Sequence, residues 1–275
     1  MTFIALFRRS AISLVLFGLL SGCAGLSSRD DVAAFEARVK VNMPEVEYSS
    51  VRKVPDSPFW ELTIEGTQLL YVTDDARFGF DGQLVDFKNH RFIRQDRAEE
   101  IIRNEIAKVD EKYMLVYGPA DAKRTLTVFI DLDCEYCERF VHDLPELTSA
   151  GVRFRILFAP RGEVNSYEFR RAVALWCSPD PKGHLAEAFR HSRVLPDKDV
   201  CMSPVFASHE LARTLGIGRT PAFVDENGRV VFGYLGMKKL VKTFHLPRPI
   251  VFTQQNPTAT ATERALGLGR PTPTP

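Results

Sequence analysis

The chain has 275 residues, of which 45% are hydrophobic and 26% are charged. This is an ordinary globular composition, with enough apolar material for one or two domains. The formal net charge is +1, from 36 basic and 35 acidic residues, so the sequence lacks the basic excess that favours a nucleic-acid partner.

Residues 1–22 have the pattern of an export signal. Two arginines precede the short apolar run "AISLVLFGLL", and small residues follow it. The run is shorter than the roughly 20 residues that a membrane-spanning helix needs. The next residues, "LSGC", resemble a bacterial lipobox, in which the cysteine, here Cys23, is acylated and becomes the new N-terminus. Ala24 in place of an aspartate favours the outer membrane, while a plain secretory peptide with an unpaired cysteine is the alternative.

A helix is expected near "DDVAAFEARVK", and a small sheet after it. The segments "FWELTIEG", "TQLLYVTDD", "ARFGFDG" and "QLVDF" are rich in β-forming residues, and turn signals at Glu65-Gly66, Asp74-Asp75 and Asp81-Gly82 separate them. The pattern predicts an antiparallel meander of about four strands. Because so small a sheet buries little apolar surface alone, we expect it to pack against a partner, most naturally a second copy of the chain.

Residues 96–114 are predicted to form a helix. Asp96 and Glu99 stand three residues apart, as in a capping box. Four apolar residues recur at helical spacing and share one face, namely Ile102, Ile106, Val109 and Tyr113. Such a helix could link two domains; an ordinary surface helix of the domain that follows is the alternative.

From about residue 115 the predicted strands and helices alternate. "LTVFIDL" and "VRFRILF" read as strands, and the helical segment "EYCERFVHDLPELTSA" between them contains Pro145, which is expected to kink it. Residues 166–177 and 181–191 read as helices, as does "SHELARTLG" with Ser208 as its cap. The alternation indicates an α/β or α+β sandwich.

The segment "PAFVDENGRVVFGY" is predicted to be a hairpin with Asn227-Gly228 as a two-residue turn. After Phe252 the chain becomes rich in Thr, Pro, Ala and Gly. We expect this end of the chain to be a disordered tail.

The five cysteines divide into one near the N-terminus and four further on. If Cys23 carries lipid, Cys134, Cys137, Cys177 and Cys201 remain, and an even number in an exported chain suggests disulfides. Four cysteines permit three pairings. The short spacing makes Cys134 and Cys137 the obvious local pair, which leaves the other two for each other.

Cys134 lies where a strand ends and a helix begins. A thiolate is stabilised at a helix N-terminus, so the pKa of this cysteine should fall. Cys137 stands one turn further on, and two thiols so placed are the minimum for thiol–disulfide exchange. Three acidic residues nearby, Asp131, Asp133 and Glu135, should oppose the thiolate. The alternatives are two ordinary core cysteines or half of a zinc site, although the sequence has no second Cys-x-x-Cys and no histidine pair with ligand spacing.

A second signal is Thr220-Pro221, which precedes the predicted strand "AFV". Proline is permitted at the start of a strand, and only about 5–6% of X-Pro bonds are cis. Together with Cys-x-x-Cys, however, this dipeptide resembles the cis-proline loop of thioredoxin-fold proteins. In that fold the loop faces the cysteine pair, and the backbone before the proline pairs with bound polypeptide like an added strand.

Taken together, these motifs resemble the DsbC and DsbG family of bacterial periplasmic disulfide isomerases over residues 30–245. "TVFIDLDCEYC" is similar to the family's active-site strand and motif, "RAVALWC…VC" to the segment with its second disulfide, and "LGIGRTPAFV" to its cis-proline loop. "LLYVTDDARFGFDGQLVDF" is similar to its dimerisation sheet, and residues 96–114 to its linker helix.

The resemblance implies an α+β fold: a thioredoxin-like catalytic domain with a helical insertion, preceded by a small cystatin-like antiparallel β dimerisation domain and a linker helix. The expected limits are a lipoprotein signal peptide at 1–22, the dimerisation domain at 23–92, the linker at 93–116, the thioredoxin-like domain at 117–250 and the tail at 251–275.

The resemblance also assigns roles to individual residues. Cys134 would be the attacking thiolate and Cys137 the resolving thiol. Substrate binding would involve four residues, Thr220, Pro221, Glu135 and Tyr136. Cys177 and Cys201 would form a structural disulfide worth about 3 kcal/mol on the loop-entropy account, with two reduced core cysteines as the alternative. No metal and no cofactor are expected.

The chain departs from the family in three features. Glu135 stands where the family has glycine, the family's members are usually soluble rather than lipid-anchored, and the Pro/Thr-rich tail has no counterpart. These features suggest a specialised member that serves an envelope or secretion assembly.

The function implied is that of a homodimeric disulfide isomerase in the periplasm. It would act on misfolded or misoxidised exported proteins and would be kept reduced by a DsbD-like membrane thiol reductant. The alternatives are a reductase or oxidant of the same fold, and a peptide-binding envelope chaperone or assembly factor.

Overall fold

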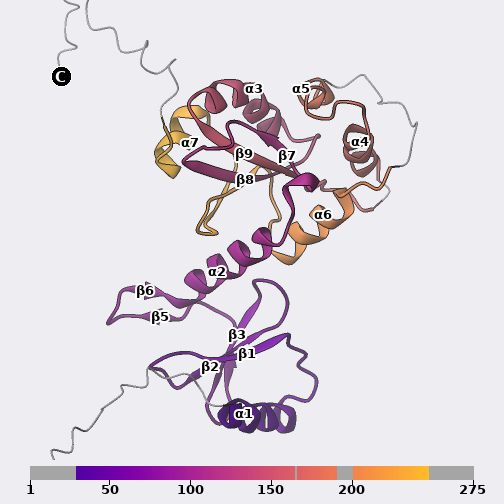
Figure 1. Ribbon diagram of the computed structural model, residues 1–275. Coiled ribbons are helices and arrows are strands. Elements are labelled where there is room, and N and C mark those ends of the chain that lie inside the picture. Colours follow the sequence, from indigo (N-terminus) through magenta and orange to yellow (C-terminus); the bar gives the residue numbers. More distant parts are fainter. Residues whose placement is uncertain (1–28, 165, 191–200, 248–275) are drawn as a thin grey trace, which may run out of the picture.

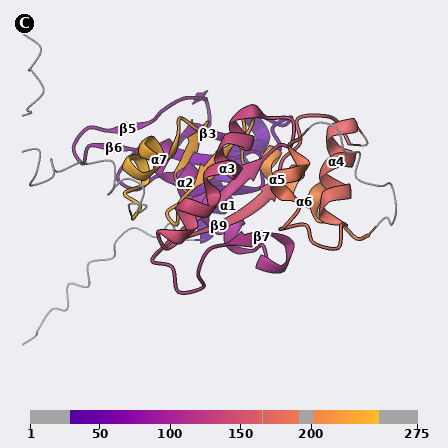
Figure 2. The same cartoon turned by 90° about the horizontal axis from the view of Figure 1, so that it is seen from above.

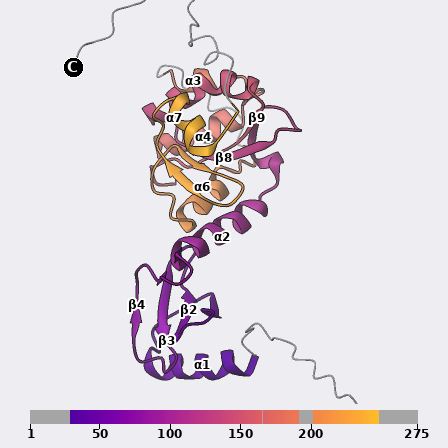
Figure 3. The ribbon, with the colours of Figure 1, turned by 90° about the vertical axis from the view of Figure 1, so that its left-hand side faces the viewer.

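The computed structural model describes residues 29–164, 166–190 and 201–247, which form two domains at opposite ends of helix α2 (Ile93–Ala107) (Figures 1 and 3). The predicted export signal, Cys23 and the tail at 251–275 lie outside the described residues. Within the described ranges no helix is both long and apolar enough to cross a membrane.

The N-terminal domain is a four-stranded antiparallel sheet covered on one face by helix α1 (Arg29–Asn42) (Figure 1). The strand order is β1-β2-β3-β4, with β1 at Ser50–Lys53, β2 at Phe59–Thr63, β3 at Leu69–Thr73 and β4 at Gly79–Phe80. The ring of Phe35 on α1 stacks on that of Trp60 with centroids 4.4 Å apart. The core of this domain therefore lies between α1 and the sheet.

The meander prediction was right in strand number and wrong in membership. Strand β1 belongs to the sheet but was not predicted, because its residues "SVRK" form a half-buried edge strand with little apolar alternation. The segment "QLVDF" is not in the sheet. It supplies β5 (Val85–Asp86), which pairs with β6 (Arg91–Phe92) in a separate hairpin.

The predicted helix 96–114 was misplaced at both ends. Helix α2 begins at Ile93, directly after the β5–β6 hairpin, and it has no side-chain cap. Asp96 lies in its first turn and accepts a hydrogen bond from Arg91 Nε at 2.8 Å, so it does not act as the cap. After Ala107 the chain leaves the helix, and the short 3-10 turn η1 (Glu111–Tyr113) follows separately.

The C-terminal domain is built on a five-stranded sheet of order β11-β10-β8-β9-β7. The central strands β8 (Arg124–Ile130) and β9 (Val152–Phe158) are parallel, and the other pairs are antiparallel. The remaining strands are β7 (Leu115–Tyr117) and β11 (Val230–Phe232) at the two edges and β10 (Ala222–Val224) between β11 and β8. Strands 124–130 and 152–158 confirm the two strands predicted there.

Helices cover both faces of this sheet. Helices α3 (Glu135–Ser149) and α7 (Met237–Phe244) pack on the face that carries Val128 and Ile130. Helices α2 and α6 (Val205–Thr214) pack on the face that carries Phe129. Alternate residues of the buried strand β8 thus serve two cores, which explains why "LTVFIDL" is almost continuously apolar.

The remaining helices lie at the side of the sheet away from α7. They are α4 (Tyr167–Trp176) and the short α5 (Leu185–Ala188), and α4 and α7 lie at opposite sides of the domain in two perpendicular views (Figures 1 and 2). Of the predicted helix at 181–191, only this single turn is helical among the described residues. Strand β7 and helix α7 were not predicted.

Two turn predictions were wrong in detail. Helix α6 begins at Val205, and Ser208 lies inside it, buried, where its hydroxyl donates to the Phe158 carbonyl at 2.7 Å. The β10–β11 hairpin has a three-residue loop, because Asp225 pairs with Arg229 and the Gly228 amide donates back to the Asp225 carbonyl at 3.0 Å. Gly228 has φ +89°, which suits the last position of such a loop.

The two domains are in direct contact beside α6. A Cβ added at Gly66, in the β2–β3 turn, would lie 1.7 Å from the carbonyl oxygen of Thr214. On either side of it, Arg213 pairs with Glu65 at 3.2 Å, and the hydroxyl of Thr67 donates to the Leu215 carbonyl at 3.3 Å. The β2–β3 turn of the N-terminal domain therefore contacts residues 213–215, a few residues before Thr220-Pro221.

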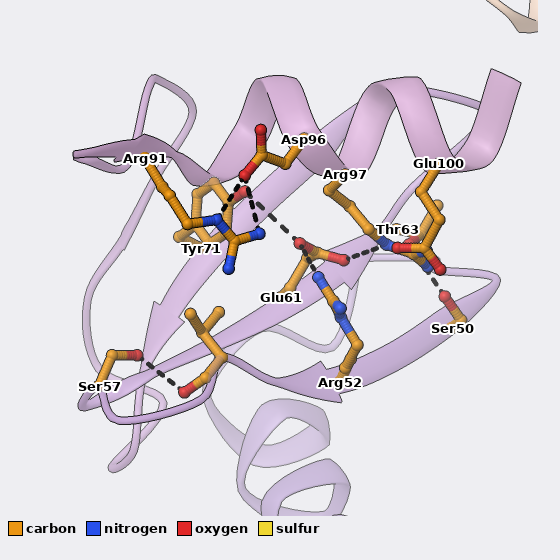
Figure 4. A network of polar contacts seen from close by, with 11 residues as sticks. Ser50, Arg52, Ser57, Glu61, Thr63, Tyr71, Arg91, Asp96, Arg97 and Glu100 are labelled. Atoms are coloured by element: carbon orange, nitrogen blue, oxygen red, sulfur yellow. Dashed lines mark hydrogen bonds and ion pairs between the residues drawn. The ribbon is translucent and has the colours of Figure 1, made fainter. Parts of the chain in front are cut away.

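A buried carboxylate fastens the N-terminal sheet to α2. Glu61 of β2 is 1% exposed, on the face opposite α1, and accepts from Arg97 Nε of α2 at 2.9 Å and from Arg52 Nη2 of β1 at 3.2 Å (Figure 4). The hydroxyl of Tyr71 on β3 donates to it at 3.4 Å, and Arg97 also pairs with Glu100 at 3.0 Å. One carboxylate thus joins three strands and the helix.

Candidate active site

The cysteine pair lies at the start of helix α3. Cys134 is the N-cap residue, with φ −106° and ψ 112°, and its side chain makes no capping hydrogen bond. The amide of Cys137 donates to the Cys134 carbonyl at 2.9 Å, so the two residues share the first helical turn. Cys134 is 8% exposed and Cys137 is fully buried, and both are free thiols.

The two thiols differ strongly in acidity. A hydrogen bond from the Cys137 thiol is the main cause that lowers the pKa of Cys134 to about 6, and it outweighs the desolvation that raises it. The Thr220 side chain and the amides of Cys137 and Tyr136 act in the same direction. Burial raises the pKa of Cys137 well above its usual range. One partner is therefore an anion at neutral pH while the other keeps its proton.

The Thr220-Pro221 loop faces the cysteine pair. The peptide bond between these residues is cis. Cys134 Sγ lies 3.3 Å from the Thr220 carbonyl oxygen, to which it donates when it is protonated, and the Pro221 carbonyl accepts from the Gly233 amide at 2.7 Å. Residues 86 positions apart in the sequence are thus brought together at the reactive sulfur.

Each of the three acidic residues that were expected to oppose the thiolate has an arginine partner. Glu135 pairs with Arg139 one turn later on α3. Asp131, 1% exposed, accepts from Arg161 Nε at 2.7 Å. These partners offset the negative charge that was expected to oppose the thiolate.

The third acidic residue, Asp133, pairs with Arg171 of α4. The spacing of Glu135 and Arg139 is a helical i,i+4 pair that could have been found in the sequence. Arg161 and Arg171 lie in segments far from the cysteines, and no local pattern links them. Arg161 also donates through Nη2 to the Asp133 carbonyl at 2.8 Å, so it bridges the loop that ends in Cys134.

Glu135 and Tyr136 lie on the outer side of the first turn of α3. The Glu135 side chain is exposed, and Tyr136 is 46% exposed. The guanidinium of Arg139 lies 5.4 Å from the centre of the Tyr136 ring. Both residues are therefore accessible beside Cys134, although neither touches Thr220 or Pro221 in the contacts described.

Cys177 and Cys201 form a disulfide away from the cysteine pair. Their Cα atoms are 5.7 Å apart, and the bond ties the end of α4 to the segment before α6. Because they bind each other, they are not ligands for a metal shared with Cys134 and Cys137. In the part of the chain that the structure describes, no group of three or more His, Cys, Asp and Glu residues could hold a metal ion.

Comparison with known proteins assigns both domains. Residues 26–95 match the family described as the disulfide bond isomerase protein N-terminal domain, and residues 112–245 match the thioredoxin-like domain. Thiol:disulfide interchange protein DsbC of Salmonella typhimurium is 27% identical over 229 residues, which cover 82% of this chain and 92% of that protein. DsbC of Escherichia coli K12 is 25% identical over 226 residues with the same coverage.

Among solved structures, a disulfide interchange protein from Neisseria gonorrhoeae is 26% identical and superposes with a TM-score of 0.44, covering 50% of this chain and 96% of that one. The sequence matches reach across both domains in the order in which the structure has them, and they include the cysteine pair at the start of α3. The chain therefore belongs to the DsbC family of thiol:disulfide interchange proteins.

Proposed function

We propose that this protein is a disulfide isomerase that acts on exported proteins. The observation that carries the proposal is the pairing of an isomerase-type N-terminal domain, at 26–95, with a thioredoxin-like domain that holds one acidic and one buried thiol. A reductase or oxidant would need only the second domain, so the first favours isomerisation.

The chemistry begins with Cys134 as the thiolate nucleophile. It attacks one sulfur of a wrong substrate disulfide, so that a Cys134–substrate disulfide forms and the second substrate sulfur leaves as a thiolate. A different substrate thiolate, either already free or released when the first one attacks another substrate disulfide, then attacks the substrate sulfur of the mixed disulfide. A new substrate disulfide results, the Cys134 thiolate is regenerated, and no electrons are gained or lost.

Cys137 is the thiol that resolves a mixed disulfide from which the substrate is not released by its own thiols. It gives up its proton, attacks Cys134 Sγ and releases the substrate as a thiol, leaving a Cys134–Cys137 disulfide. That outcome reduces the substrate by two electrons, so a thiol donor must restore the pair. A DsbD-like membrane reductant is the proposed donor.

Substrate polypeptide is proposed to bind along the Thr220-Pro221 loop, beside Glu135 and Tyr136. The short distance from the Thr220 carbonyl to Cys134 Sγ, 3.3 Å, supports this role. A chain that pairs with the backbone at Thr220 would present its sulfur to Cys134 without further rearrangement. The accessible ring of Tyr136 offers an apolar contact next to it.

A homodimer joined through the N-terminal domains is also proposed. Strand β4 is an edge of the sheet, and four phenylalanines just before β4, on it and at the β5–β6 hairpin are exposed, namely Phe78, Phe80, Phe87 and Phe92. Apolar rings beside an unpaired strand edge favour strand pairing with a second copy. A monomer in sedimentation velocity at micromolar concentration would contradict the dimer.

The proposed location is the periplasm, with Cys23 acylated and the protein held at a membrane, the outer membrane in preference. The "LSGC" pattern after a short apolar run supports the anchor. The mass of the mature chain tests it, since lipid must add to Cys23 and residues 1–22 must be absent.

Reactivation of scrambled ribonuclease in glutathione buffer tests the proposed activity. The mature chain should restore ribonuclease activity, and Cys134→Ala should restore none above the buffer alone. Reactivation by Cys134→Ala would favour a chaperone. If neither form reactivates ribonuclease and the wild type reduces insulin, the protein is a reductase and not an isomerase.

A further inference from the structure

A cavity of about 510 Å³ opens beside the Thr220-Pro221 loop. Three segments form it: the loop after β9 at 159–161, the face of α6 that carries His209 and Arg213, and residues 216–220. Thr220 lines the cavity, and its carbonyl oxygen is 3.3 Å from Cys134 Sγ. The cavity therefore begins beside the reactive sulfur and extends towards the contact between α6 and the N-terminal domain.

Every ionisable side chain that lines this cavity is basic. They are Arg161, His209 and Arg213, and none of the lining residues that the structure describes is acidic. Small and apolar residues such as Ala159 and Ala212 form the remaining wall. A wall of this kind favours a carboxylate and disfavours an ammonium group.

Arg161 is held in a fixed position at the rim. Its Nε donates to Asp131 at 2.7 Å and its Nη2 to the Asp133 carbonyl at 2.8 Å. Asp131 is 1% exposed and does not line the cavity, so a ligand meets the guanidinium before the carboxylate behind it. Among the described contacts, Nη1 of Arg161 has no hydrogen-bond or ion-pair partner.

Arg213 is oriented in a similar way on the opposite wall. It binds Glu210 at 3.1 Å and Glu65 of the N-terminal domain at 3.2 Å, and neither carboxylate lines the cavity. Both arginines are thus pre-positioned by acidic partners that do not line the cavity. Pre-positioning reduces the conformational entropy lost when a ligand binds.

We propose that this cavity is a specificity site for an acidic side chain of the substrate, one or two residues from the cysteine that Cys134 attacks. The proposal rests on the function proposed above. An extended chain advances about 3.3 Å per residue, so a glutamate one or two residues from the attacked cysteine lies within about 7 Å of it along the chain, beside the Thr220 end of the cavity. Disulfides flanked by Asp or Glu are therefore preferred over those flanked by Lys.

The test uses three matched peptides. Each carries one cysteine, capped as a disulfide with 2-mercaptoethanol, and has Glu, Gln or Lys at the two positions on each side of it. The probe is the rate at which each peptide forms a mixed disulfide with Cys134 in the Cys137→Ser variant, followed by mass spectrometry. Dividing each rate by that of the same peptide with dithiothreitol removes differences in the peptides' own reactivity.

At low salt the Glu peptide should react about three- to fivefold faster than the Gln peptide, and the Lys peptide should be the slowest, as expected for partly exposed charge pairs. The preference should vanish near 1 M salt, where charges are screened within about 3 Å. In Arg161→Gln the ratio of Glu to Gln should fall towards one. Any effect on the Cys134 thiolate cancels, because it is common to all three peptides.

The matched control is Arg229→Gln, which removes the same charge from an exposed residue at the hairpin loop, at the end of β10 that is remote from Pro221. It should keep the full preference. If Arg161→Gln does not fold, Arg213→Gln should lower the ratio in its place.

Equal normalised rates for the three peptides at low salt would overturn the specificity site while leaving the isomerase intact. A preference that survives in both cavity variants would also overturn it. Failure of every peptide to react with Cys134 would instead contradict the proposed function.

Discussion

Iodoacetamide should alkylate Cys134 of the reduced protein with a half-maximal rate near pH 6, and it should leave Cys137 unmodified until the protein unfolds. The thiolate is the reactive species, and the pKa of Cys134 is about 6. As pH falls from 7 to 5, the thiolate fraction drops from about 91% to about 9%, so the rate should fall roughly tenfold. Cys137 is fully buried and its pKa is raised, so iodoacetamide cannot reach its sulfur and the thiol stays protonated.

The measurement is the pH profile of the alkylation rate, read by mass spectrometry on the intact chain. Cys134→Ser should abolish the modification altogether. Cys137→Ala should move the midpoint to higher pH, because the hydrogen bond from Cys137 is the largest cause of the lowered pKa. A wild-type midpoint near 8.5, the value of an ordinary cysteine, would contradict this account of the site.

A pKa near 6 affects Cys134 both as the attacking thiolate and as the leaving group of the mixed disulfide. The thiolate of a more acidic thiol is intrinsically less nucleophilic, and this offsets part of the gain in rate that comes from a larger thiolate fraction. It is, however, a better leaving group, so the mixed disulfide between Cys134 and a substrate breaks readily. Isomerisation needs this reversibility, since the substrate must repeatedly gain and lose its bond to Cys134.

The parts of the site that are local in sequence could be predicted from it. The cysteine pair follows an apolar strand and begins an amphipathic helix, and the structure has both elements there. The pairing of Cys177 with Cys201 followed once Cys134 and Cys137 were taken as a local pair, whereas the cis bond before Pro221 was implied only by the resemblance to a family, because the isomer is not encoded in spacing. The structure contains both features.

Contacts between distant segments could not be predicted. Arg161 and Arg171 reach Asp131 and Asp133 only because β9 and α4 pack beside the cysteine loop. Asp96 had the spacing of a helix cap, yet the β5–β6 hairpin leads straight into α2 and occupies the place of the cap. For the two arginines a tertiary contact decides the partner, and for Asp96 the strand that directly precedes the helix does.

Removing the Glu61 carboxylate should produce the largest loss of stability in the N-terminal domain. Glu61→Ala would leave Arg97, whose side chain is 16% exposed, without its main partner beneath α2, and would free Arg52 and Tyr71 as well. Breaking a buried pair in this way costs about 3–5 kcal/mol. The free energy of unfolding in urea measures the loss, with Trp60 fluorescence read in a Trp176→Phe background so that one domain is reported.

Arg91→Gln is the matched control, because it breaks the exposed Arg91–Asp96 pair at the start of the same helix and should cost less than about 1 kcal/mol. Equal losses for the two variants would show that the Glu61 network does not fasten the sheet to α2. If the Glu61 network does fasten the sheet to α2, the Glu61→Ala variant should lose ribonuclease reactivation under mild urea. Its Cys134 should keep an alkylation midpoint near pH 6. The chemistry belongs to the C-terminal domain, whereas isomerisation needs that domain held in place by the other.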